Sequence, residues 1–124
     1  MTRIYCFDLD GTLVTEHSTK GADSDYTRAK PIPNAVKRVR ELWKEGNEFI
    51  IMTARGKRAG IDSTEFTKQQ LKEFDIPYDS LIMNVKPHAD VFVDDKAWNA
   101  RDWRSSTKAP NWLKKTKIVY ALEN

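Results

Sequence analysis

Residues 4–13 read Ile-Tyr-Cys-Phe-Asp-Leu-Asp-Gly-Thr-Leu, an apolar run that leads into two acids, a glycine and a threonine. The run predicts a buried strand at about residues 3–8. Side chains two residues apart on an extended segment point to the same side, so Asp8 and Asp10 are expected to share a face. Gly11 lets the backbone turn sharply behind them. Two carboxylates this close repel each other unless a cation or a shared proton intervenes, and the stretch therefore predicts a functional site.

A solvated turn and a calcium-binding loop are the alternatives for this stretch, and both fit it less well. Asp, Gly and Thr are common in solvated turns at strand ends. A calcium-binding loop also begins Asp-x-Asp, but it needs glycine at its sixth position. Here the glycine is fourth and an apolar strand precedes the acids.

The length of 124 residues predicts a single domain, residues 1–124, with a real core and little room for a second module. No segment approaches the roughly 18 consecutive apolar residues of a membrane span. The N-terminal residues lack the apolar region and cleavage site of a signal peptide. A single cysteine, Cys6, agrees with a reducing compartment, and its apolar strand predicts a packed, inert thiol. We therefore expect a cytoplasmic protein that does not enter a membrane.

Strand and helix signals alternate along the chain, which predicts a mostly parallel sheet covered by helices on both faces. This is the α/β class, a Rossmann-like three-layer sandwich. Residues 14–32 are polar and predict a loop or flap, and residues 56–60 predict a basic loop. Strands are predicted at about residues 3–8, 48–52, 81–83, 91–93 and 118–120, and helices from Pro33 to Gly46, from a capping box at residues 62–65 to about Phe74, and at residues 97–104.

Ligands of such sheets bind at the carboxyl ends of the strands. In this chain polar and charged residues follow four predicted strands, and all of them fall on that one edge. They are Asp8 and Asp10 after the first strand, Thr53 after the second, Lys86 after the third, and Asp94 with Asp95 after the fourth.

This ordered set resembles the haloacid dehalogenase (HAD) superfamily of phosphohydrolases. Within it, the chain looks like the small capless members, especially the capsule-biosynthesis type phosphatases. The resemblance spans residues 4 to about 96, and beyond the first strand it is carried by residues 50–55, 76–79, 86–87 and 93–96. It implies a capless HAD-like core that hydrolyses phosphate monoesters through an aspartyl phosphate.

The resemblance implies that Asp8 is the nucleophile and Asp10 the acid/base. It implies that Thr53 and Lys86 hold the phosphoryl group, a role that suits a hydroxyl donor and a point charge. We expect the substrate to contact Gly11, Thr12, Thr53, Arg55 and Lys86. For Arg55, pairing with an acidic neighbour is an equal alternative.

A carboxylate that attacks a phosphate monoester meets an anion, and Mg²⁺ bridging the two would cancel that repulsion. Mg²⁺ prefers oxygen ligands and keeps several waters. The expected metal ligands are Asp8, Asp94, the backbone carbonyl of Asp10 by resemblance, and Asp95 either directly or through water.

Several other residues near these motifs are weaker candidates. His88 lies between Lys86 and Asp94 and is expected to be a loop residue near the site. His17, Asp23, Asp25 and Tyr26 lie where this superfamily often carries a flap that contacts substrate, although a solvated loop is the simpler interpretation.

The net charge is only +3, but residues 96–117 hold seven bases and one acid. Trp98, Trp103 and Trp112 are interleaved with these bases in a segment of about residues 97–124. Such a mixture can bind nucleic acid through phosphate contacts and stacking. Tryptophans that pin a tail to the core, with solvated lysines around them, are the stronger interpretation.

The expected substrate is a small phosphorylated metabolite such as a sugar phosphate, in an open site that a second copy of the chain could enclose. A polynucleotide 3′-phosphatase and a noncatalytic phosphate- or metal-binding module are the alternatives. Retention of both Asp8 and Asp10 favours an enzyme, because metal binding alone requires no acid/base at the second position.

Overall fold

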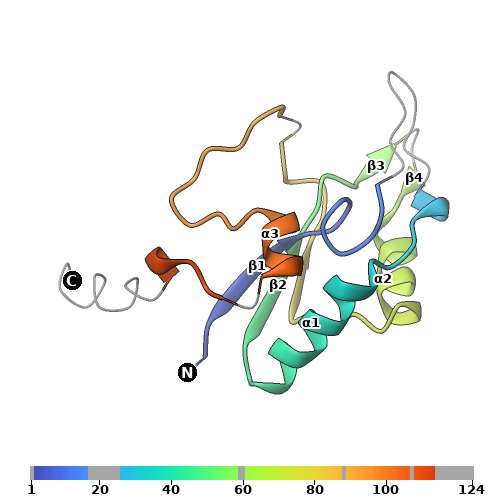
Figure 1. The fold of residues 1–124 in the computed structure, drawn as a ribbon. Helices are drawn as coiled ribbons and strands as arrows, with labels where there is room; N and C mark the ends of the chain where they lie inside the picture. Colours follow the sequence, from blue (N-terminus) through green and yellow to red (C-terminus); the bar gives the residue numbers. More distant parts are fainter. Residues whose placement is uncertain (1, 17–25, 59–60, 88, 107, 114–124) are drawn as a thin grey trace. The chain divides into compact units, whose positions relative to one another are not determined.

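The computed structural model describes residues 2–16, 26–58, 61–87, 89–106 and 108–113. The chain divides into two compact units, residues 1–88 and 89–124, and each is described by itself. The second unit contains α3 (Ala100–Ser105). The first contains β1 (Ile4–Asp8), the 3-10 turn η1 (Tyr26–Arg28), α1 (Pro33–Lys44), β2 (Glu48–Met52), β3 (Lys57–Arg58), β4 (Ile61–Asp62), α2 (Thr64–Glu73) and β5 (Ser80–Ile82) (Figure 1).

Three parallel strands in the order β1-β2-β5 form the sheet of the first unit. Tyr5 pairs with Phe49, and Ile51 with Leu81. α1 connects β1 to β2, and α2 connects β2 to β5. Right-handed connections place both helices on the same face of the sheet. The α/β, Rossmann-like class is therefore as predicted, but α1 and α2 form one helical layer in this unit, whereas helices on both faces of the sheet were predicted.

Aromatic rings fill the space between the sheet and α1. The Phe7 and Phe49 rings meet edge to face with centroids 5.1 Å apart, and the Trp43 ring of α1 lies 5.4 Å from that of Phe49. The opposite face of β1 carries Ile4 and Cys6, which are exposed. The prediction of a packed cysteine is therefore wrong, because β1 alternates between a buried and an exposed face. Although the residue is exposed, partial desolvation of its thiol, followed by the nearby Asp8 carboxylate, raises the pKa of Cys6.

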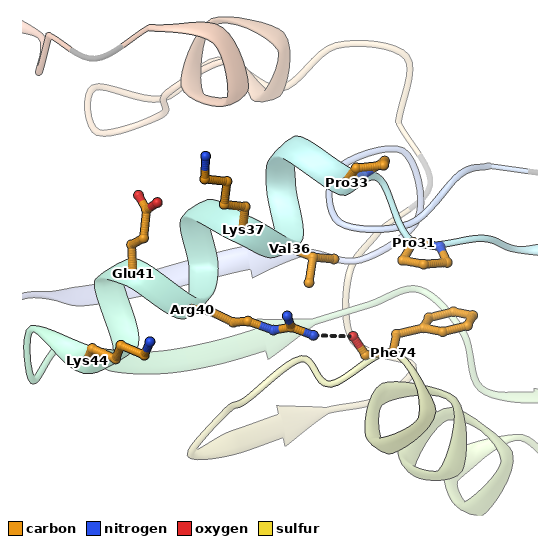
Figure 2. Close-up of a pocket in the computed structure, with 8 residues that line it drawn as sticks. All are labelled: Pro31, Pro33, Val36, Lys37, Arg40, Glu41, Lys44 and Phe74. Carbon is orange, nitrogen blue, oxygen red and sulfur yellow. Dashed lines mark hydrogen bonds between the residues drawn. The ribbon is translucent and has the colours of Figure 1, made fainter.

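Arg40 of α1 binds the two residues that follow α2, Phe74 and Asp75 (Figure 2). Its Nε donates to the Asp75 carbonyl at 3.1 Å and its Nη2 to the Phe74 carbonyl at 3.5 Å. Nη2 also lies 2.9 Å from the Asp75 carboxylate. The predicted stop of α1 at Gly46 is confirmed, since this residue has φ of +89°, where glycine carries no Cβ penalty.

The predicted capping box at residues 62–65 begins with Asp62, and the Asp62 carboxylate accepts from the Thr64 N–H at 2.9 Å. Ser63, directly before α2, makes no side-chain cap; its hydroxyl donates to the Gly56 carbonyl at 2.6 Å. Residues 57–58 of the expected basic loop at 56–60 instead form β3, which pairs antiparallel with β4, so the loop prediction is wrong for these two residues.

The second unit departs from two predicted elements. Residues 91–93 form no strand and are exposed, Val93 at 93%, since apolar residues alone do not supply the ladder of hydrogen bonds that defines a strand. The predicted helix at residues 97–104 begins later, at Ala100, because the Asn99 side chain accepts from the Arg101 N–H at 3.0 Å. The strand predicted at residues 118–120 lies outside the described residues. None of the helices in the described ranges is long and apolar enough to cross a membrane.

Asn47 ties the end of α1 to the start of β1, and its replacement should destabilise the first unit. Its Oδ1 accepts from the Arg3 N–H at 3.0 Å and its Nδ2 donates to the Leu42 carbonyl at 2.8 Å. We predict that Asn47→Ala lowers the free energy of unfolding by about 1–3 kcal/mol, because two partly buried backbone groups lose the partner that the buried Asn47 side chain supplies. Thermal or urea denaturation measures the loss, with the exposed Glu45→Ala as control. Equal stability of the two variants would contradict the assignment.

Candidate active site

Asp8 is the last residue of β1, and its carboxylate faces Lys86 beyond β5. Lys86 Nζ lies 3.0 Å from Asp8 Oδ1, and the Thr12 hydroxyl lies 3.5 Å from Oδ2. Burial raises the pKa of Asp8 although Lys86 opposes the shift, and Asp10 adds a smaller upward contribution. One lysine therefore does not offset the cost of desolvating this carboxylate.

A tight turn after β1 carries Asp10 to a different partner. Gly11 has φ of +85°, a backbone conformation that other residues rarely adopt, and its N–H donates to the Val14 carbonyl at 2.7 Å. The Leu9 carbonyl accepts from the backbone N–H groups of residues 12–14. Main-chain hydrogen bonds thereby fix the turn. The Asp10 side chain points from it to the loop that follows β2.

Asp10 and Arg55 form a bidentate ion pair. Arg55 Nε donates to Asp10 Oδ2 at 2.9 Å and Nη2 donates to Oδ1 at 2.7 Å. The Arg55 side chain is fully buried, and that of Asp10 is 19% exposed. Of the two roles predicted for Arg55, the structure shows pairing with an acidic neighbour.

The far side of the Arg55 guanidinium contacts two residues that sequence reasoning missed, Thr67 and Gln70, and one that it named as a flap candidate, Tyr26. Its Nη1 donates to Gln70 Oε1 at 2.8 Å and to the Thr67 hydroxyl at 3.3 Å. The Tyr26 ring lies 4.3 Å from the guanidinium carbon. The available signal was the position of Thr67 and Gln70, three residues apart on the buried side of α2, where apolar residues are the rule.

Thr53 stands at the carboxyl end of β2, as predicted. Its N–H donates to the Ile82 carbonyl at 3.0 Å, and its hydroxyl oxygen accepts from the Arg55 N–H at 3.1 Å. The residue is 1% exposed. Thr53 therefore has a defined orientation beside the Asp10–Arg55 pair.

The loops after β2 and β5 press against each other at Gly56. The Asn84 N–H donates to the Arg55 carbonyl at 2.6 Å, and Asn84 has φ of +57°. A Cβ at Gly56 would overlap the Asn84 side chain. This close approach sets the path of the chain toward Lys86, two residues further on.

The stems of the predicted flap are joined beside the site. The Thr15 N–H donates to the Lys30 carbonyl at 2.8 Å, and the Ile32 N–H donates to the Leu13 carbonyl at 3.0 Å. Tyr26 opens η1 and places its ring over Arg55. His17, Asp23 and Asp25 lie outside the described residues, as does His88.

Asp94 and Asp95 belong to the second unit. That they share a metal site with Asp8 therefore stays a prediction. The Asp94 carboxylate accepts from the Lys96 N–H at 3.0 Å, and this bond, followed by one to the Asp95 side chain, lowers the pKa of Asp94. Among the described residues, three or more acids, histidines or cysteines do not gather at one point. The Asp8 carboxylate at the end of β1 supplies oxygen donors of the kind that Mg²⁺ prefers, with Lys86 Nζ 3.0 Å from Oδ1.

The basic segment is only partly described. Trp103 is buried, whereas Trp98 and Trp112 are partly exposed, and the lysines at 114, 115 and 117 lie outside the described residues. Both the structural and the polyanion-binding interpretations of this segment stay predictions.

A shallow groove of about 510 Å³ lies between α1 and the end of α2 (Figure 2). Its charged side chains are Lys37, Arg40, Glu41 and Lys44, and Arg40 is already engaged by Asp75. No predicted site residue lines it. The groove offers no convergent set of reactive groups.

Comparison with known proteins gives the fold. No family model matches the chain, and no curated protein does. The crystal structure of an MCSG target from Vibrio cholerae is similar over 100% of both chains, with a TM-score of 0.69 and 24% sequence identity. This similarity supports the α/β fold.

Asp8 should make stability depend on pH in a defined direction. Its folded-state pKa lies above the unfolded value of about 3.9, so its favourable contribution is present below that value and is lost as pH rises through the folded pKa. We predict that wild type loses stability relative to Asp8→Asn as pH rises from the unfolded pKa of about 3.9 through the raised folded-state pKa of Asp8. Thermal unfolding of both proteins in EDTA measures the gap. A wild-type advantage that grows with pH would mean that Lys86 outweighs desolvation.

Gly56→Ala should destabilise the contact between the two loops by about 1–3 kcal/mol, the usual cost of overpacking. Removing the opposing side chain in the double variant Gly56→Ala/Asn84→Gly should restore part of this loss, since Asn84 also has positive φ, which glycine adopts freely. Denaturation of the two single variants and the double variant measures the coupling. Additive effects would show that the two positions do not press on each other.

Proposed function

We propose that the protein is a Mg²⁺-dependent phosphomonoester hydrolase of the HAD type that works through an aspartyl phosphate. The observation that carries the proposal is the different setting of two carboxylates at the end of β1. Asp8 faces Lys86 and keeps a raised pKa, whereas Asp10 is held by the buried Arg55. Asp8 is thus placed at the strand end beside a cation, and Asp10 is held in one orientation by Arg55.

Asp8 is the nucleophile in this proposal. One of its oxygens bonds to phosphorus while the bond from phosphorus to the leaving oxygen breaks, and that oxygen takes a proton from Asp10, which enters this step as the protonated acid and regains the proton from water in the next. Asp10 then removes a proton from water, which attacks the phosphorus and releases Asp8 and phosphate. Arg55 holds both oxygens of Asp10, so the carboxylate keeps one orientation through both steps.

Lys86 and Thr53 hold the phosphoryl group in this mechanism. Lys86 already lies 3.0 Å from Asp8, so its charge lies where phosphoryl oxygens would arrive. Gly11 and Thr12, in the turn beside Asp8, complete the proposed contacts to substrate. Arg55 is buried against Asp10, so we assign it to the acid/base and not to the phosphate.

Mg²⁺ would supply charge neutralisation between Asp8 and the phosphoryl oxygens and fix their alignment. The proposed ligands are Asp8, the Asp10 carbonyl, Asp94 and Asp95. Oxygen donors of this kind match its preference.

A small phosphorylated metabolite such as a sugar phosphate is the proposed substrate, by resemblance to capsule-biosynthesis phosphatases. The single cysteine agrees with a cytoplasmic location. A polynucleotide 3′-phosphatase is the second candidate, favoured by the bases and tryptophans of residues 96–117. A binding module would have no use for an acid/base held by its own buried arginine.

The decisive experiment is a phosphatase screen with Mg²⁺ over sugar phosphates, nucleotides and 3′-phosphorylated oligonucleotides. We predict that wild type hydrolyses sugar phosphates, and that Asp8→Asn abolishes turnover because the amide is not a nucleophile. Asp10→Asn should slow turnover by about 10²–10⁴-fold, the usual contribution of acid–base catalysis, yet still bind Mg²⁺. Exposed Glu45→Ala is the control.

Each other outcome has a definite meaning. Wild-type rates in Asp8→Asn would reject the aspartyl phosphate. Preference for an oligonucleotide end would make the polynucleotide phosphatase the leading function. Inactivity on all substrates, with Mg²⁺ or phosphate still bound, would indicate the binding module.

A further inference from the structure

Gln70 joins two parts of the first unit that flank the Asp10–Arg55 pair. Its Oε1 accepts from Arg55 Nη1 at 2.8 Å, and its Nε2 donates to the Tyr26 carbonyl at 2.9 Å. The residue is 7% exposed. A buried amide with both ends engaged has one orientation, because reversing it would set donor against donor and acceptor against acceptor.

We propose that Gln70 is a positioning residue for Asp10, acting through Arg55, and that it couples the backbone of η1 to the acid/base carboxylate. The inference rests on the proposed function, since it assigns Asp10 the proton transfers described above. Gln70 does not touch substrate in this scheme; it fixes the guanidinium that fixes Asp10.

The chemistry of the amide suits this task. Arg55 must be held from the side opposite Asp10 by a group that does not compete for its charge. A carboxylate at position 70 would draw the guanidinium away from Asp10, whereas a neutral carbonyl oxygen satisfies Nη1 and leaves the charge to the ion pair. The Thr67 hydroxyl, at 3.3 Å, is the longer and weaker second acceptor.

Tyr26 closes the other side of this arrangement. Its ring covers the guanidinium, with 4.3 Å between the ring centroid and Cζ, while its carbonyl is held by Gln70. Arg55 is thus confined by the ring, the amide and Asp10 together. A change at Gln70 frees the guanidinium to rotate and releases the carbonyl of Tyr26.

Leaving-group dependence separates positioning from a general loss of structure. Protonation by Asp10 matters when the leaving group is a poor one, such as a sugar alkoxide, and matters little for p-nitrophenolate. A loosely held Asp10 should therefore reduce kcat/KM for an alkyl phosphate far more than for p-nitrophenyl phosphate. A fall in the amount of folded enzyme would reduce both equally.

The test compares Gln70→Met with Gln69→Met, the same change at the exposed neighbouring position. We expect Gln70→Met to lower kcat/KM about 10–100-fold for glucose 6-phosphate and less than about threefold for p-nitrophenyl phosphate, in the range of a misplaced catalytic group. Gln69→Met should match wild type on both. Gln70→Glu, which keeps the acceptor but adds charge and loses the donor to Tyr26, should not rescue the alkyl substrate.

A second measurement needs neither substrate nor Mg²⁺. In NMR spectra, the Arg55 Nη–H groups should give separate resonances in wild type and Gln69→Met, because the guanidinium rotates slowly. In Gln70→Met faster rotation should average these resonances. The resonances are assigned by their disappearance in Arg55→Lys. If they behave so while wild type is inactive on both phosphates, the proposed function fails and the Gln70–Arg55–Asp10 link stands. Unchanged resonances in Gln70→Met, or equal losses on the two substrates, would overturn the link itself.

Discussion

A fully buried guanidinium is the constraint on which the site depends. Burying the Arg55 charge is costly unless every donor finds an acceptor, and the bidentate pair with Asp10 meets most of that demand. Removing one partner from such a pair typically costs about 3–5 kcal/mol, because the other charge is left uncompensated. Arg55 is therefore fully paired only when the turn after β1, the loop after β2 and the inner side of α2 are all in their native positions.

The two carboxylates of the Asp8-Leu9-Asp10 segment are treated differently by the fold. Asp10 is matched by two hydrogen bonds from a guanidinium, whereas Asp8 faces one lysine, and burial raises the pKa of Asp8. Under the proposed mechanism this difference is functional: the Asp8 carboxylate attracts Mg²⁺ and meets the phosphoryl group. In that case the desolvated Asp8 lowers the stability of the protein locally and serves the reaction, a common trade-off at active sites.

Part of the candidate site could be located from the sequence, because ligands of parallel sheets bind at the carboxyl ends of the strands. Asp8, Asp10, Thr53 and Lys86 each follow a parallel strand, and the structure brings Lys86 to Asp8 as that rule expects. The role of Arg55 was undecided because a guanidinium suits a phosphate and a carboxylate equally; its full burial decides for Asp10. Gln70 was missed because a polar residue on the inner side of a helix signals a partner but does not identify it.

By itself, the sequence determined the order of β1, α1, β2, α2 and β5, since hydrophobic periodicity and the glycine and proline signals are local properties of the chain. Tertiary structure alone decided which face of β1 is covered, that the Ser63 hydroxyl bonds to the Gly56 carbonyl, and that residues 91–93 form no strand. It also decided the partner of Asp10, which lies 45 residues away along the chain. The physical reason is that periodicity encodes which side of an element is apolar, whereas a buried polar group takes its partner from whatever the packing of distant segments brings within hydrogen-bond distance.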